Sequence, residues 1–184
     1  MKLLCPALYA ASMSLAASQG VYAQPPDDTP HADHSVEGSG PLVDLVRRET
    51  RRYRNVENAV EDGYEPGPCV SGPEEGAMGI HYVKASLIGD GLVDPATPEA
   101  LIYEPQPNGA LRLVGVEYIT LAEFWPDPDR PVLAGHLLNF VGAPNRYGLP
   151  AFLEIHVWAW RRNPNGTFVD WNPNVSCDAM PLPN

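Results

Sequence analysis

The chain has little positive charge, little cysteine and no long apolar segment beyond its start. Lysine and arginine number 12 against 23 aspartates and glutamates, so the net charge is −11 at pH 7. An acidic surface repels polyanions, which argues against nucleic acids and anionic membranes as partners. After residue 23, no segment approaches the roughly 18 consecutive apolar residues that a membrane-spanning helix requires.

Several familiar catalytic signatures are also missing. The sequence contains no Gly-x-Ser-x-Gly elbow, no His-Glu-x-x-His helix, no phosphate-binding loop and no dinucleotide-binding glycine fingerprint. These absences exclude the commonest forms of serine hydrolase, zinc protease and nucleotide-binding enzyme. The ionisable side chains of the predicted strands remain as the candidates for chemistry.

The first 23 residues have the composition of a secretory signal peptide. Lys2 supplies a basic start, Leu3–Ala17 is almost entirely apolar, and Val21–Ala23 has small residues at the positions that a signal peptidase reads. We expect cleavage before Gln24 and export to the periplasm or the exterior, with no membrane anchor. Residues 24–40 contain too few apolar side chains to order themselves, which predicts a flexible leader.

Cysteine is scarce but informative. Of the three cysteines, Cys69 and Cys177 follow the predicted signal peptide. An even number of cysteines in an oxidising compartment favours a disulfide bond. A bond between Cys69 and Cys177 closes a long loop in the unfolded chain, which is expected to contribute about 4–5 kcal/mol of stability. Free thiols or metal ligands are the competing interpretation, which export disfavours.

The apolar pattern predicts a single α+β domain over residues 41–184. Pro41 begins a long helix whose apolar residues recur every three to four positions, and Gly63 lies where a left-handed cap would follow. A Pro/Gly loop is expected from Tyr64 to Gly79. The predicted strands are Met78–Lys84, Ala100–Glu104, Leu111–Leu121, Val132–Phe140, Phe152–Trp160 and Thr167–Trp171.

Two Pro-Asn-Gly turns, at 107–109 and 164–166, predict hairpins because Asn-Gly tolerates the positive φ of tight turns. We therefore expect one long N-terminal helix packed on a mostly antiparallel sheet of five to six strands. A curved sheet or a small barrel is one form that such a sheet can take.

The run from Phe152 to Trp160 is the most β-like in the chain and holds the best candidate site. Glu154 and His156 are two positions apart, so a strand places both side chains on one face, roughly 7 Å apart. The opposite face is aliphatic and predicts a core; it consists of Ala151, Leu153, Ile155, Val157 and Ala159.

Two other predicted strands each contribute a side chain that can bind a metal. His81 lies within one apolar strand, and Glu117 lies within another, on the face of Leu113, where an unpaired charge would be costly. Two imidazoles with one or two carboxylates are recurrent ligands of Zn, Mn and non-haem Fe. The sequence therefore predicts a divalent metal site of His81, Glu117, Glu154 and His156.

These residues admit three functional interpretations. In the first, an exported protein binds a divalent metal or a small ligand. In the second, an enzyme uses the same groups for metal-assisted hydrolysis or oxygenation, or as an acid/base pair without metal. In the third, the groups are structural, paired with neighbours or fixing the subunit interface of a homo-oligomer. His136 is a weaker additional candidate.

Six segments carry a resemblance to known sequences. They are Gly76–Val83, Pro98–Pro105, Leu113–Tyr118, Glu154–Trp160, Asn163–Gly166 and Asp170–Cys177. Together they resemble a family of small exported bacterial proteins, over most of the chain from about Tyr53 onward. The resemblance implies export and a single domain, and it supplies no activity, cofactor or catalytic residue.

Overall fold

Residues 40–180 are described by the computed structural model and belong to one unit, Ser35–Asn184. The predicted signal peptide, and the predicted leader apart from Gly40, lie outside the described residues. Within residues 40–180, no helix is both long enough and apolar enough to cross a membrane.

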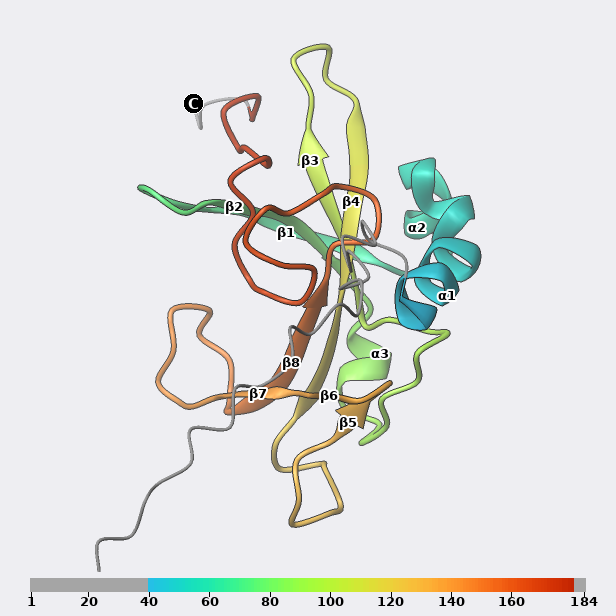
Figure 1. The fold of residues 1–184 in the computed structure, drawn as a ribbon, viewed down its shortest axis with the longest axis vertical. Coiled ribbons are helices and arrows are strands. Elements are labelled where there is room, and N and C mark those ends of the chain that lie inside the picture. Colours follow the sequence, from blue (N-terminus) through green and yellow to red (C-terminus); the bar gives the residue numbers. More distant parts are fainter. Residues whose placement is uncertain (1–39, 181–184) are drawn as a thin grey trace, which may run out of the picture. The chain divides into compact units, whose positions relative to one another are not determined.

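Six antiparallel strands form the main sheet, which is curled into half a barrel (Figure 1). Their order in the sheet is β1-β2-β3-β4-β8-β7, and a small second sheet pairs β5 with β6. The strands of the main sheet are β1 (Glu65–Gly72), β2 (Gly76–Val83), β3 (Ala100–Pro105), β4 (Leu111–Leu121), β7 (Asn139–Val141) and β8 (Phe152–Val157). The second sheet consists of β5 (Val132–Leu133) and β6 (His136–Leu137).

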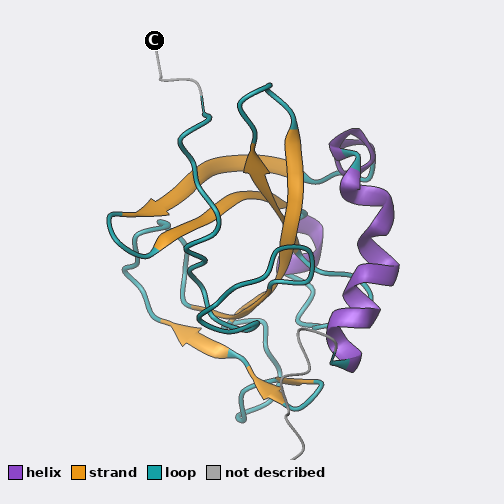
Figure 2. Cartoon of the chain, turned by 45° about the horizontal axis from the view of Figure 1, so that its top comes forward, coloured by secondary structure: helices purple, strands orange, loops and turns teal. Residues whose placement is uncertain are grey.

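The helices are short and lie beside the sheet (Figure 2). They are α1 (Pro41–Thr50), the 3₁₀ turn η1 (Arg51–Arg54), α2 (Val56–Glu61) and α3 (Ala85–Ile88). The predicted long N-terminal helix, and with it the predicted fold class of a long helix on a sheet, is wrong. The described chain is mostly sheet, with only short helical segments.

The helix breaks at Asn55, for a local reason. Asn55 has an extended backbone (φ −93°, ψ 113°), and its side chain accepts a hydrogen bond from the Glu57 N–H at 3.2 Å, which caps a new helix. None of the residues of η1 is fully buried, although Tyr53 packs against the main core. Gly63 has a φ of 87° after α2, the left-handed conformation expected there.

The sheet has two different faces. One face packs on the helices and forms the main core, which includes Val43, Val46, Leu101, Tyr103, Val116, Tyr118, Leu153, Ile155 and Val157. On β8 the alternate residues Phe152, Glu154 and His156 are also buried but do not belong to that core. The predicted alternation of the strand from Phe152 is thus confirmed, and its aliphatic face is the core face.

Other strand predictions need correction. Residues 65–72 form the edge strand β1 where a loop was expected; an edge tolerates Pro66 and Pro68, and the pairing with β2 is irregular there. The second hairpin does not form: β8 ends at Val157, and no strand occurs at 167–171. The expected strand Val132–Phe140 is divided among β5, β6 and β7.

The predicted disulfide is confirmed. Cys69 of β1 is bonded to Cys177, across a sequence separation of 108 residues. This bond attaches the C-terminal segment to the edge of the sheet, and such bonds are typical of an oxidising compartment.

Candidate metal centre

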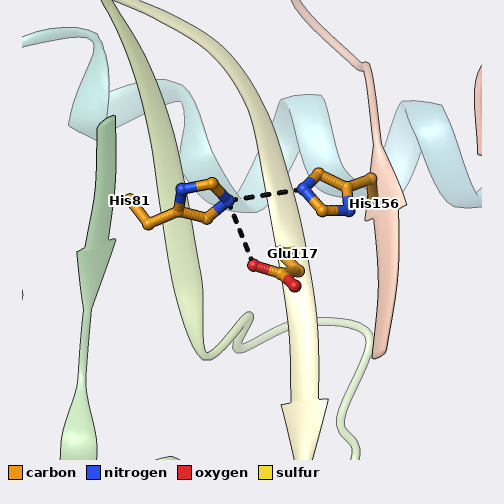
Figure 3. A group of neighbouring side chains, drawn as sticks. All are labelled: His81, Glu117 and His156. Atoms are coloured by element: carbon orange, nitrogen blue, oxygen red, sulfur yellow. Dashed lines mark hydrogen bonds and ion pairs between the residues drawn. The ribbon is translucent and has the colours of Figure 1, made fainter. Parts of the chain in front are cut away.

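The strand register brings Glu117 and His156 together. Glu117 of β4 pairs directly with His156 of β8, and their side chains share the face opposite the main core. On the other side of Glu117, β3 presents Ala100 as its partner. The His81 side chain extends from β2 over β3 toward Glu117 (Figure 3).

Three ligand atoms converge at this point. The Nε2 atom of His81 lies 3.3 Å from Nε2 of His156 and 3.2 Å from Oε2 of Glu117. Figure 3 shows the two rings with a nitrogen of each directed at the other, and the Glu117 carboxylate beside them. One ligand atom from each residue lies within 4.8 Å of the other two. Of the four predicted ligands, these three form one cluster.

A bulge explains why Glu117 is on this face. The pairing of β3 with β4 shifts between Ile102 and Tyr103, whose partners are Gly115 and Leu113, so Val114 is an additional residue. Leu113 therefore packs in the main core, whereas Glu117 faces the cluster. The prediction that Leu113 and Glu117 share a face is wrong.

Glu154 lies on the far side of the His156 ring. Its Oε2 is 3.2 Å from His156 Nδ1, and its Oε1 accepts a hydrogen bond from the Asn139 amide at 2.9 Å. Glu154 is therefore placed to orient the imidazole, and it is outside the group formed by His81, Glu117 and His156. Glu154 and His156 form a second group of acidic and imidazole atoms with Asp170.

Asp170 and Asn139 were not identified from the sequence. Asp170 Oδ1 lies 3.7 Å from His156 Nδ1. In the sequence, however, Asp170 is in a loop after β8 and is separated from every predicted metal residue. No spacing motif marks either residue, because both reach the site through the tertiary fold. His136 lies elsewhere, with its ring 3.8 Å from that of Phe168.

The cluster is well buried, and its electrostatics favour positive charge. The side chains of His156, Glu117 and His81 are 2%, 8% and 14% exposed. Burial alone would lower the pKa of His156, but Glu117, Glu154 and Asp170 raise it to about 9. A site that stabilises a proton so strongly offers the same electrostatic environment to a metal cation.

The two glutamates differ in their pKa directions. Burial opposes ionisation of Glu117, but the charge of His156 and the contact with His81 outweigh it and lower the Glu117 pKa. Burial raises the pKa of Glu154, although its bond with His156 acts in the opposite direction. Glu117 is thus the better anionic ligand of the two.

The cluster forms part of the wall of a cavity of about 430 Å³. His81, Glu117 and His156 line it together with apolar side chains from β1, β2, β4, β8 and the loop after β7. Ligand atoms on a cavity wall leave the remaining coordination positions of a bound metal accessible to a small molecule. Comparison with family models, curated proteins and solved structures finds no match to this chain.

Proposed function

We propose that this protein binds one divalent transition metal, of the group Zn²⁺, Mn²⁺ and Fe²⁺, through His81, Glu117 and His156. The observation that carries the proposal is that His156 Nε2 and Glu117 Oε2 lie 3.3 Å and 3.2 Å from His81 Nε2. Two imidazoles and one carboxylate with open positions are a recurrent ligand set for such metals.

Hydrogen bonding alone satisfies this arrangement poorly. An imidazole nitrogen carries either one proton or one lone pair, so His81 Nε2 can form one good hydrogen bond. It nevertheless has two partners at nearly the same distance. Ligand atoms about 2.0–2.1 Å from a tetrahedral metal lie about 3.3 Å from one another, and both separations from His81 Nε2 have this length.

The surroundings of His156 support the same proposal. A metal-bound histidine usually donates its other N–H to a carboxylate, which fixes the tautomer and directs the free lone pair at the metal. Glu154 is 3.2 Å from His156 Nδ1 and is itself held by Asn139. In this role Glu154 and Asn139 position a ligand and do not bind the metal.

Metal analysis of full-length protein purified without an affinity tag tests the proposal. We expect one equivalent of metal after loading, and loss of binding in His81→Ala and in Glu117→Gln. His136→Ala is the matched control, because His136 stacks on Phe168 away from the cluster. Far-UV circular dichroism checks that each variant folds. Folded wild-type protein that takes up no Zn²⁺, Mn²⁺ or Fe²⁺ would falsify the proposal.

A metal-assisted enzyme is the second candidate, and the cavity favours it. A metal on the cavity wall can bind substrate and water side by side, as hydrolysis or oxygenation requires. Turnover of esters, or of hydrocarbons with O₂ and Fe²⁺, by metal-loaded protein but not by Glu117→Gln would support this function. Stoichiometric metal binding without turnover on these substrates favours simple binding.

We also infer export to the periplasm or the exterior. The sequence of residues 1–23, the resemblance to exported proteins and the Cys69–Cys177 bond support this location. Mass spectrometry of the mature protein should find Gln24 at its N-terminus. Protein retained in the cytoplasm with Met1 intact contradicts the inference.

A further inference from the structure

The cavity beside the proposed metal site is mostly apolar. Away from the two histidines and the carboxylates, its wall is formed by hydrocarbon side chains such as Val83, Ile119, Val141, Leu149 and Phe152. Its volume of about 430 Å³ lies in the range of about 300–1,000 Å³ that is typical of sites for small molecules. A ligand that fills it must bring an apolar body.

One cation, Arg146, also lines the cavity. Its guanidinium lies 5.4 Å from the centre of the Trp171 ring, and within residues 40–180 it forms no ion pair with a carboxylate. A guanidinium held over an aromatic ring keeps its N–H donors in its own plane, where they can bind a carboxylate. Arg146 is therefore available to an anionic group inside the cavity.

Tyr147 adds a neutral hydrogen-bond donor. Its hydroxyl lies 3.6 Å from Met78 Sδ, and a thioether sulfur is a weak acceptor. Tyr147 and Met78 both line the cavity. The hydroxyl can exchange this weak contact for a stronger hydrogen bond to a ligand oxygen.

The charges in the cavity determine which ligand fits. A divalent metal bound by Glu117 keeps one net positive charge, and Arg146 adds another. Asp170 also lines the cavity and opposes Arg146, while Glu154 is turned toward His156 and Asn139. Together the metal, Glu117, Arg146 and Asp170 leave one net positive charge in the cavity, which one carboxylate balances.

We propose that the metal-loaded cavity binds a small organic monocarboxylate with a hydrocarbon body. Its carboxylate would be held between the metal and Arg146, with the Tyr147 hydroxyl as an additional donor, and its hydrocarbon part would contact Phe152, Val83 and Ile119. This proposal rests on the metal-binding function above and names the class of molecule that the site takes.

Titration of the Co²⁺-loaded full-length protein tests the proposal, because the visible absorption of Co²⁺ reports its ligands. We expect 3-phenylpropionate to change the Co²⁺ spectrum with saturation. Acetate, which lacks the apolar body, and 3-phenylpropanol, which lacks the charge, should each bind at least tenfold more weakly. Arg146→Gln should weaken 3-phenylpropionate binding at least tenfold and leave Co²⁺ uptake unchanged.

Arg48→Gln is the matched control, since the Arg48 side chain is exposed on α1 and pairs with Glu49; this variant should bind 3-phenylpropionate like the wild type. A Co²⁺ spectrum that does not respond to 3-phenylpropionate overturns this inference and leaves metal binding intact. Equal affinity for 3-phenylpropanol, or no effect of Arg146→Gln, also overturns it. Failure to take up Co²⁺ refutes the metal site itself, and this inference with it.

Discussion

His156 has different neighbours at its two ring nitrogens. Nε2 faces His81 at 3.3 Å, and Nδ1 faces Glu154 at 3.2 Å. A protonated Nδ1 that donates to Glu154 leaves the lone pair of Nε2 directed at the proposed metal. The identity of residue 154 therefore affects metal affinity without contact between residue 154 and the metal.

We predict that Glu154→Gln lowers Zn²⁺ affinity by about 10- to 100-fold, because an amide holds the imidazole N–H less strongly than a carboxylate does. Competition with a chromophoric chelator measures the affinity. Glu123→Gln, on an exposed loop, is the control and should bind Zn²⁺ like the wild type. Complete loss of binding in folded Glu154→Gln would instead identify Glu154 as a ligand.

Glu99 is a further buried carboxyl group, outside the cluster. It is 2% exposed and accepts a hydrogen bond from the Ile119 N–H at 3.0 Å. Burial, reinforced by the charges of Asp90 and Glu117, raises the pKa of Glu99 to about 8 despite the hydrogen bonds that oppose the shift. Glu99 is therefore protonated in the folded protein at neutral pH.

This shift predicts a pH dependence of stability. The folded state holds the Glu99 proton up to about pH 8, whereas the unfolded chain releases it near pH 4.5, so the stabilisation is lost as pH rises between these values. Urea unfolding at pH 5 and pH 9 measures the free energy of unfolding of each protein. From pH 5 to pH 9, that of the wild type should fall by more than about 1 kcal/mol beyond any change in Glu99→Gln, since one pKa unit corresponds to about 1.4 kcal/mol. Parallel pH profiles for the two proteins would contradict the prediction.

At the scale of the elements, contact between β4 and β8 requires a glycine. A Cβ at Gly115 would lie 2.9 Å from the carbonyl oxygen of Val157, closer than real Cβ atoms approach backbone. Glu117, which lies two residues after Gly115 on β4, pairs with His156. Close approach of the strands at Gly115 therefore supports the distance between two proposed ligands.

Gly115→Ala should destabilise the protein by about 1–3 kcal/mol, because the added methyl group pushes β4 from β8. It should also weaken metal binding. Gly89→Ala is the control, since a Cβ there meets only the Phe124 ring at 3.7 Å. Thermal unfolding measures the stability and Zn²⁺ titration measures the metal affinity. Equal stability of Gly115→Ala and Gly89→Ala would contradict the prediction, because it would show that β4 can move from β8 without loss of stability.

The elements also show where sequence patterns succeed and fail. The alternation on β8 follows from the geometry of an extended chain, so the shared face of Glu154 and His156 was predictable. The break at Asn55 was not, because the apolar period continues through it and only the extended backbone of that residue ends the helix. The bulge at Val114 was not predictable either, because it depends on the pairing of β4 with β3.

At the scale of the whole molecule, the disulfide joins the first strand of the sheet to the C-terminal segment. Cys69 lies on edge strand β1 and also lines the cavity, and Cys177 lies in the C-terminal segment. The 108-residue separation makes the bond a constraint on more than half of the unfolded chain, and long loops lose the most entropy on closure.

We predict that Cys69→Ala/Cys177→Ala lowers the free energy of unfolding by roughly 4 kcal/mol. Guanidinium unfolding with and without reductant measures it: reductant should destabilise the wild type and leave the double variant unchanged. A wild type that is insensitive to reductant, with its thiols shown to be free, would refute the bond.

The amino-acid sequence by itself determined local features: the two faces of β8, the pair of cysteines suited to oxidation, and the identity of the polar residues inside apolar strands. Tertiary structure alone decided which of those residues meet. His81, Glu117 and His156 come together through the order β2-β3-β4-β8 and the bulge at Val114. The physical reason is that side-chain direction is set within a strand, whereas distance between strands depends on register and on partners far away in the chain.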